Sequence, residues 1–240
     1  LIVVGDFDPE QMNRWVDDYF GWIPHPSTPI PQVTTKEPAR SKDRIVNLTS
    51  ANAPLPALAM TWLIPPAKNA DSIPLSVAAE LLAGGKSSRL YQSLVYDQQI
   101  TQNVGVFADS RVGPGLFTAY AILASGHTPD QARKAILAGI DKLASQPIDA
   151  AELAKVKTQM LTDQLKQRQT PIGKAFALGQ AALYEGDPAR ANTDLEALQK
   201  VSAADVQRVL KKYVIDAHSV TINYRPGKKK AAKASKEASE

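Results

Sequence analysis

Apolar residues recur along the chain at two spacings, and these spacings predict the order of its strands and helices. Residues 1–4 are a continuous apolar run typical of a strand. Asp8 and Pro9 then have the form of a helix start, and Gly21 predicts the end of that helix. The apolar positions of the helix recur every three or four residues, at Met12, Trp15, Val16, Tyr19 and Phe20.

The composition changes after this helix. Between residues 23 and 42, prolines stand at positions 24, 26, 29, 31 and 38, with Ser and Thr among them. Each proline fixes its own φ angle and lacks an N–H donor, so neither a helix nor a central strand can run through this stretch. The pattern predicts an extended linker and a domain boundary.

A longer series of strands and helices follows the linker. Strand-like runs are found at 43–48, 55–63, 101–109, 115–123 and 219–224, and helical spacing at 72–83, 87–97, from Thr128, from Asp149, at 172–185 and at 202–213. Two sequential strand pairs, a helical block and a closing strand predict an α+β fold, with a helical layer on one face of a mainly antiparallel sheet. No apolar run reaches the eighteen or so residues that a membrane span requires.

Charge and cysteine content narrow the possible functions. The net charge is +4, but the tail from Lys228 to Glu240 holds five Lys and two Glu and so carries three of these charges. The rest of the chain is close to neutral, and we expect no nucleic-acid partner. The absence of cysteine excludes disulfides, thiolate nucleophiles and zinc–sulfur sites.

The run Gly84-Gly85-Lys86-Ser87 is similar in part to a phosphate-binding loop, which would need a further glycine at position 80. Glu80 stands there instead, and a carboxylate would repel a phosphate. The run also follows a predicted helix rather than a strand. We therefore interpret it as a glycine turn between two helices.

The three histidines, His25, His127 and His218, lie far apart in the sequence. No pair has the spacing of three or four residues that places two imidazoles on one helix face, so no zincin motif is present. The pattern Gly-x-Ser-x-Gly of a nucleophile elbow is also missing. The sequence therefore predicts neither catalytic residues nor a metal site in this chain.

Several segments, taken in order, resemble the pitrilysin/insulinase-type zinc peptidases, a family that includes the mitochondrial processing peptidases. Leu1–Glu10 and Tyr19–Trp22 resemble the last strand and helix of its catalytic-type domain. Leu81–Tyr91 resembles its glycine turn and the Ser-Ser-Arg-Leu-aromatic helix that follows, and Asp149–Lys157 resembles the acidic start of a long helix. These segments are spread over nearly the whole chain.

The resemblance implies a domain organisation. Residues 1–22 would be the last strand and helix of an upstream catalytic-type domain, and 23–42 the linker. Residues 43–225 would be the C-terminal non-catalytic domain of a bacterial zinc protease, and 226–240 a basic disordered tail. The family's zinc is held by a His-x-x-Glu-His helix and a later Glu, which would lie upstream of Leu1. The chain alone is then expected to be inactive and to contain no cofactor, while the parent protein contains zinc.

The family's C-terminal domains often supply an Arg and a Tyr, with six residues between them, to the substrate. The matching positions here are Val95 and Gln102, which cannot make the same contacts. We expect them to face peptide substrate or a partner. The implied partners are the upstream zinc-bearing domain, a peptide substrate, and a second family subunit or a homodimer that provides the missing donors.

Two alternative functions remain open. The chain could be a catalytically inactive subunit or assembly module of the same family, or an unrelated α+β interaction domain. An intact or degraded His-x-x-Glu-His motif upstream would separate the first alternative from a peptidase. The Ala- and Gln-rich helices and the missing cysteines favour an exported bacterial protein, and hence the periplasm.

Overall fold

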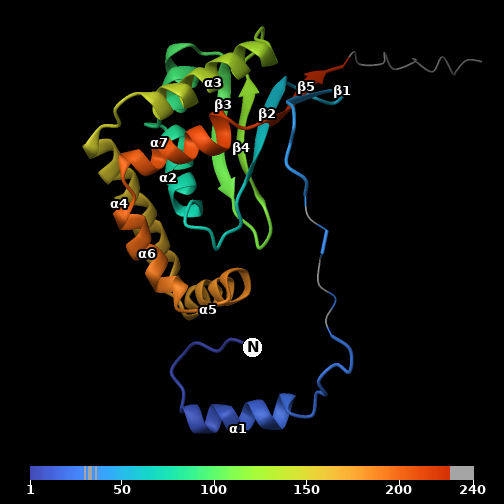
Figure 1. The fold of residues 1–240 in the computed structure, drawn as a ribbon, viewed down its shortest axis with the longest axis vertical. Helices are drawn as coiled ribbons and strands as arrows, with labels where there is room; N and C mark the ends of the chain where they lie inside the picture. The colour runs from blue at the N-terminus through green and yellow to red at the C-terminus, as the bar shows by residue number, and fades with distance from the viewer. Residues whose placement is uncertain (30, 32–33, 36, 228–240) are drawn as a thin grey trace, which may run out of the picture.

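The computed structural model describes residues 1–29, 31, 34–35 and 37–227. At its centre is a five-stranded sheet with the order β1-β5-β2-β4-β3 (Figure 1). The strands are β1 (Arg44–Ser50), β2 (Ala57–Ile64), β3 (Thr101–Asp109), β4 (Gly115–Leu123) and β5 (Ser219–Pro226). β1 pairs with β5 in parallel, and every other pair is antiparallel. The sheet is thus mixed but mainly antiparallel, as the sequence predicts.

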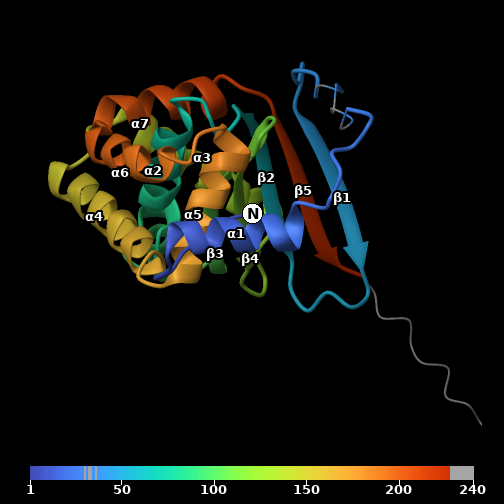
Figure 2. The same ribbon diagram turned by 90° about the horizontal axis from the view of Figure 1, so that it is seen from below.

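Helices cover one face of this sheet (Figure 2). The helices on this side are α2 (Ser72–Ala83), α3 (Pro129–Ser145), α4 (Ala150–Gln167), α5 (Pro171–Gln180), α6 (Arg190–Lys200) and α7 (Ala203–Leu210), with π-helical segments η1 (Tyr91–Asp97), η2 (Ala181–Glu185) and η3 (Lys211–Ile215). Helices α2 and α3 pack on the strands, α4 and α6 pack on α2, and α5 packs on α6 and η2. The remaining helix, α1 (Pro9–Phe20), precedes the linker. The α+β prediction is confirmed. None of the described helices combines the length and apolar character that a bilayer crossing requires.

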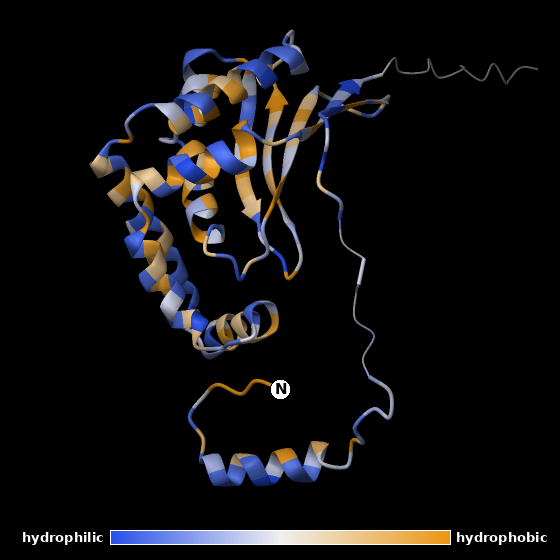
Figure 3. Cartoon of the chain, in the orientation of Figure 1, coloured by the Kyte–Doolittle hydropathy of each residue, from blue (hydrophilic) through white to orange (hydrophobic). Residues whose placement is uncertain are grey.

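The core lies between the sheet and the helices. Along β2, alternate residues from Leu58 to Ile64 are buried, and their neighbours are only partly covered. Trp62 and Phe117, on neighbouring strands, are almost fully buried and meet edge to face with 6.2 Å between ring centroids. Figure 3 shows the apolar colours concentrated on the inner strands and on the helix faces toward them.

Capping groups begin several helices where the sequence places them. Asp8 accepts from the Gln11 N–H at the start of α1, and Asp149 accepts from two amides at the start of α4. Thr128 and Ser202 form full capping boxes at α3 and α7. Each side chain satisfies an amide that would otherwise lack a partner.

The N-terminal run and one helix differ from the expected pattern. Residues 1–4 pair with no strand of the described sheet, and their place as the last strand of an upstream domain stays a prediction. Helix α6 was not predicted, because its start at Ala189 has no side-chain cap and only two of its residues, Ala191 and Leu198, are buried. The described residues of the proline-rich stretch 23–42 form no helix or strand, while residues 228–240 of the predicted basic tail lie outside the described residues.

Candidate functional site

A hollow of about 330 Å³ runs along the outer edge of β3. Five successive strand residues, 103–107, line one side, and the glycine turn with Tyr91 lines the other. Successive residues of a strand point to opposite faces of the sheet. Because all five border the hollow, it follows the free backbone edge of β3 rather than one face of the sheet.

The edge itself is open to a pairing partner. β3 is the last strand of the sheet and pairs only with β4 among the described residues. Its register shifts between Thr101 and Asn103, where the strand bulges. Backbone donors and acceptors on such an edge can pair with another extended chain.

Two aromatic side chains, on β3 and β4, line the strand side of the hollow. Phe107 is 47% exposed, and its ring centroid lies 6.3 Å from that of Tyr120 on β4. A Cβ atom placed on Gly105 would lie only 2.3 Å from the Tyr120 ring. The glycine therefore leaves room for the Tyr120 ring to lie close against β3.

The glycine turn on the opposite side has a fixed conformation. Gly85 has a φ angle of 97°, which an L side chain rarely adopts. The Ser88 Oγ donates to the Gly85 carbonyl at 2.6 Å, and the Gln92 amide donates to the Lys86 carbonyl at 2.7 Å. These bonds hold Lys86, an exposed cation, at the mouth of the hollow. The prediction of a turn between two helices is confirmed.

Two polar contacts attach this turn to α4. Arg89 donates from Nε and Nη2 to the two carboxylate oxygens of Glu152, at 2.9 and 2.6 Å. The Lys155 ammonium donates to the Ser87 Oγ at 2.7 Å. A bidentate Arg–carboxylate pair fixes orientation as well as distance. The two sequence segments that resemble the zinc peptidases, around Leu81–Tyr91 and Asp149–Lys157, are therefore in direct contact.

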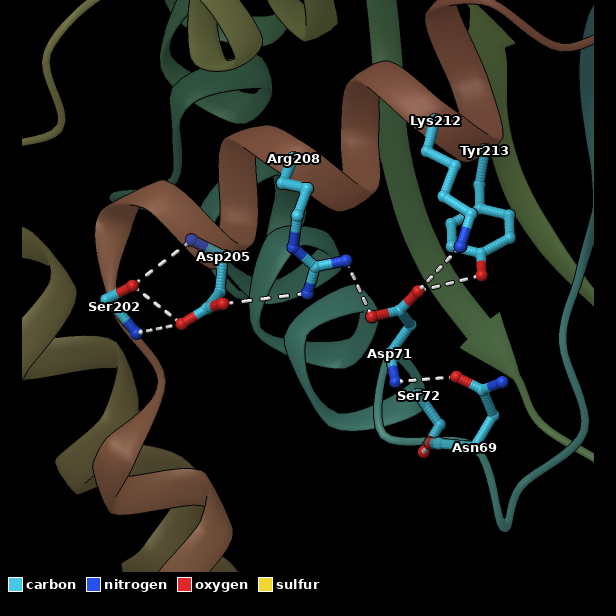
Figure 4. A network of polar contacts seen from close by, with 8 residues as sticks. All are labelled: Asn69, Asp71, Ser72, Ser202, Asp205, Arg208, Lys212 and Tyr213. Atoms are coloured by element: carbon cyan, nitrogen blue, oxygen red, sulfur yellow. Dashed lines mark hydrogen bonds and ion pairs between the residues drawn. The ribbon is translucent and has the colours of Figure 1, made fainter.

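A second polar network fixes the other end of α2 (Figure 4). Asp71, 8% exposed, accepts from Arg208 at 2.7 Å, from Tyr213 at 2.8 Å and from Lys212 at 3.2 Å. Its backbone N–H donates to the Asn69 side chain at 2.9 Å. Residues from α7 and η3 thus hold the start of α2, while Arg89 holds the segment beyond its end.

The presence or absence of such donors sets the direction in which the pKa of each buried carboxyl group on this helix is shifted. Burial alone would raise the pKa of Asp71, but the hydrogen bonds from Arg208, Tyr213 and Lys212 outweigh it and hold the pKa below its ordinary value. Glu80, on the next turns of α2, has no such donors. Burial and the nearby charge of Asp163 raise the pKa of Glu80.

The structure separates the two positions that the resemblance singles out. Val95 lies in η1, partly buried against the hydrophobic core. Gln102 lies at the bulge of β3 and is exposed. The hollow is lined by neither of them. A contact of Val95 or Gln102 with substrate or partner stays a prediction.

Sequence reasoning did not find the residues that line the hollow. Lys86 was interpreted only as part of a glycine turn, and Tyr91, Phe107 and Tyr120 only as element positions. The signal that could have found them is the exposed aromatic at 107 on a strand of alternating apolar residues. Which strand lies at the sheet edge was not evident from the sequence.

Among the described residues, no three His, Asp or Glu side chains gather in a group that could hold a metal ion. His218, for example, lies near a single carboxylate in its ion-pair contacts among the described residues, with 3.8 Å between its Nδ1 and the Asp43 Oδ1. The donor set of the described chain does not fit the zinc site of a peptidase.

An α+β domain with an open edge strand and no zinc-ligand cluster in its described residues corresponds to a known class. The model of the peptidase M16 inactive domain matches residues 1–160. The chain belongs to this family, and the resemblance to pitrilysin-type zinc peptidases is confirmed.

Individual relatives agree with this assignment. The chain is 24% identical to the zinc protease PqqE of Helicobacter pylori over 235 residues, which cover 94% of the chain and 51% of the relative. A protease structure from Helicobacter pylori superposes with a TM-score of 0.87 at 23% identity, over 93% of this chain and 54% of that one. The chain thus spans about half the length of these relatives.

A shorter structure resembles most of this chain. The inactive peptidase domain of a Bordetella parapertussis zinc protease is 27% identical, with a TM-score of 0.64, over 72% of this chain and 93% of that one. Its likeness covers nearly all of that protein, so a unit of this kind has been solved separately from the rest of a protease.

Proposed function

We propose that this chain is the non-catalytic domain of a zinc-dependent metalloendopeptidase, and that it binds peptide substrate as an added strand along β3. The main support for this proposal is the hollow along the free edge of β3, which is bordered by residues 103–107 and the glycine turn. Edge-strand addition uses backbone hydrogen bonds for affinity and side-chain pockets for selectivity. Such binding accepts many sequences, which suits a domain that receives unfolded peptides.

The lining predicts which peptides bind best. Phe107 and Tyr120 offer an apolar wall, and Lys86 offers a positive charge at the mouth. An extended segment with an apolar side chain toward the aromatics and an acidic residue toward Lys86 would match both. The rigid attachment of the turn through Arg89 and Glu152 keeps these groups at a fixed separation.

The zinc belongs, in this proposal, to polypeptide upstream of Leu1. When bound there, the metal would activate water for attack on the peptide bond. The described residues do not fit a zinc site, so this chain contributes binding and enclosure and no step of the hydrolysis. If Val95 and Gln102 mark lost substrate contacts, a second family subunit or a second copy would supply the oxyanion donors.

Peptide binding to the chain tests the edge-strand proposal. A fluorescent ten-residue peptide with alternating apolar and acidic side chains is titrated, together with two versions N-methylated at alternate residues. Methylation of one alternate set removes the N–H groups that face β3, and methylation of the other set removes those that face solvent. We expect one version to lose binding and the other to keep it.

Equal binding of both methylated peptides would refute strand addition. The zinc assignment is tested separately on the parent polypeptide that extends upstream of Leu1. Its peptidase activity should vanish with a chelator and return with zinc, and adding the partner subunit should raise it. An active parent that is insensitive to chelators would contradict the assignment.

A further inference from the structure

The hydrogen bonds of β4 decide which backbone groups of β3 face the free edge. In an antiparallel sheet, alternate residues of an inner strand bond to the strand on one side, and the residues between them bond to the strand on the other. The Leu123 N–H donates to the Pro56 carbonyl, on the β2 side, at 2.9 Å. The Ala124 N–H donates to the Ile100 carbonyl, on the β3 side, at 3.0 Å. The even-numbered residues of β4 therefore bond to β3.

The register between β4 and β3 then identifies the outward groups of β3. From residue 103 to residue 109 the register runs without a shift, and Gly105 lies opposite Tyr120. The odd-numbered residues of β3 in this stretch thus use their N–H and C=O groups on β4. The groups that point to the free edge belong to the residues between them, which are Val104, Val106 and Ala108.

Side chains on β3 alternate between the two faces of the sheet. Val104 and Val106 are buried in the core, on the face where α2 packs. Gly105 and the exposed Phe107 lie on the opposite face. An added strand continues this alternation. Its successive side chains therefore point in turn to the glycine turn, on the helical face, and to Phe107, on the other face.

The Tyr120 ring lies over Gly105. A Cβ atom on Gly105 would lie 2.3 Å from the Tyr120 Cε1 and 2.7 Å from its hydroxyl oxygen. The far end of this side chain therefore takes the space that a side chain at position 105 would use. Tyr120 lines the hollow along β3 for this reason, although it belongs to the inner strand β4. A peptide residue opposite Gly105 would meet the Tyr120 phenol, with the Phe107 ring beside it.

We propose that Tyr120 determines which peptide binds, and that the preferred peptide has an aromatic residue opposite Gly105 and an acidic residue next to it in sequence. The peptide runs antiparallel to β3, which is the direction with the more stable pairing. Its aromatic ring packs on Tyr120 and Phe107, and its acidic side chain points to Lys86 on the other face. This inference rests on the proposed function, since it gives the register and the preferred sequence of the peptide that β3 binds.

Pairing geometry explains why the position opposite Gly105 is selective. Val104 and Val106 exchange hydrogen bonds with the peptide residues opposite them, so the position between them is a pair without hydrogen bonds. The two Cα atoms of such a pair lie about 4.5 Å apart, closer than in a hydrogen-bonded pair. Because Gly105 has no side chain, a large peptide side chain fits at this short separation and covers the Tyr120 ring. Aromatic pairs add to the gain from buried area alone.

N-methylation of single peptide residues tests the register. In antiparallel pairing the N–H of the aromatic residue points away from β3, whereas the N–H groups of its two neighbours point to Val104 and Val106. We expect methylation of the aromatic residue to change the affinity by about twofold or less, and methylation of either neighbour to weaken it by about tenfold or more. Parallel pairing reverses the pattern, so the reversed result would overturn the proposal.

Substitutions at Tyr120 test its role in selection. Two peptides, with Phe or Ala at the central position, are compared on each protein by fluorescence anisotropy. We expect the chain to prefer the Phe peptide by about tenfold, Tyr120→Ala to reduce this preference to about twofold, and Tyr120→Phe to keep it. The ratio of the two affinities is the readout, because a general loss of stability would weaken both peptides alike.

Ile122→Ala is the matched control for Tyr120→Ala. Ile122 points to the same face of β4 and is 39% exposed, and it is not among the residues that line the hollow. We expect this variant to keep the full preference for the Phe peptide. A preference that is unchanged in Tyr120→Ala, or equally reduced in Ile122→Ala, overturns the role of Tyr120.

The spacing of the acidic residue is tested in the same assay. A peptide with Glu next to the aromatic residue should bind about threefold more tightly, at low salt, than one with Glu two residues away. In the second peptide the Glu side chain falls on the face of the aromatic ring, away from Lys86. Lys86→Gln should remove this difference and leave the aromatic preference in place. Equal binding of both peptides to the chain, or a difference that survives Lys86→Gln, contradicts the acidic part of the proposal.

Hydrogen exchange distinguishes failure of this inference from failure of the proposed function. Bound peptide should slow exchange of the outward amides, those of Val104, Val106 and Ala108, whereas the Gly105 amide is already bonded to β4 and should change little. Slow exchange in β2 confirms that each variant is folded. Protection of the outward amides with an unaltered preference in Tyr120→Ala keeps strand addition and overturns this inference alone. If peptide protects none of the β3 amides, both proposals are wrong.

Discussion

Arg89 and Glu152, 63 residues apart in sequence, form a two-point ion pair, with Nε–Oε1 and Nη2–Oε2 distances of 2.9 and 2.6 Å. Both side chains are mostly covered, at 21% and 31% exposure. The pair joins the helix after the glycine turn to the first turn of α4. It therefore sets the position of one wall of the hollow along β3.

We expect Arg89→Ala and Glu152→Ala each to lower the free energy of unfolding by about 1–2 kcal/mol. The double variant should show a coupling energy of about 1 kcal/mol in a denaturant-unfolding cycle. The looser pair Arg133–Asp130, at 3.6 Å and with side-chain exposures of 31% and 59%, provides a control in which we expect coupling close to zero. Additive effects at Arg89 and Glu152 would contradict the structural role assigned to this pair.

The lowered pKa of Asp71 predicts that the folded chain loses stability in acid. Its pKa is lowered in the folded chain, so its stabilising contribution is complete above the ordinary pKa of a carboxyl and is lost as the pH falls through the lowered value. Asp71→Asn should lower the free energy of unfolding by about 1–3 kcal/mol at pH 7, because Arg208 and Tyr213 lose a charged acceptor. Thermal melts at pH 7 and pH 3 should show the variant less sensitive to acid than the parent chain.

The raised pKa of Glu80 predicts the opposite pH dependence of folding stability. Burial and the charge of Asp163 raise its pKa in the folded chain, so ionisation is harder there than in the unfolded chain. Its unfavourable contribution therefore appears as the pH rises through the ordinary carboxyl pKa toward the raised value. We expect Glu80→Gln to raise the melting temperature at pH 7 and to have little effect at pH 4. An equal change at both pH values would show that ionisation is not the cause.

The close contact between Gly105 and Tyr120 predicts that a side chain at position 105 weakens peptide binding in the hollow along β3. A Cβ atom there would lie 2.3 Å from the Tyr120 ring, so Gly105→Ala must displace that ring, which lines the hollow along β3. Peptide binding should weaken about tenfold or more, with a moderate loss of stability of about 1–2 kcal/mol. Gly113→Ala is a suitable control, because no atom lies within 4 Å of its Cβ position. Binding that survives Gly105→Ala would place the peptide elsewhere.

Zinc binding tests directly whether the metal site lies outside this chain, in the upstream polypeptide. We expect the purified chain to take up less than one tightly held zinc per molecule after dialysis against the metal, measured by atomic absorption. The parent polypeptide should retain one. Stoichiometric zinc in the chain, together with chelator-sensitive cleavage of a peptide, would overturn the assignment of the metal to the upstream domain.

The sequence by itself determined most of the secondary structure, because the local rules that govern it act over a few residues. Asp8, Thr128, Asp149 and Ser202 cap helices through bonds to amides three residues away or fewer. The apolar run at residues 55–63 indicated the strand that the structure has at Ala57–Ile64. The order of the motifs around Leu81–Tyr91 and Asp149–Lys157 was also enough to indicate the family, as the match to residues 1–160 confirms.

Only the tertiary structure decided which two strands, β1 and β3, lie at the sheet edges and which surfaces meet. The order β1-β5-β2-β4-β3 results from pairings across as many as 176 residues, and no local pattern distinguishes the edge strand β3 from the inner strand β4. Likewise, Arg89 and Glu152, or Ile2 and Gly179, become neighbours only through packing of elements distant in sequence. Periodicity indicates which side of a helix or strand is buried. The element that packs against that side depends on contacts between residues distant in sequence, which no local pattern specifies.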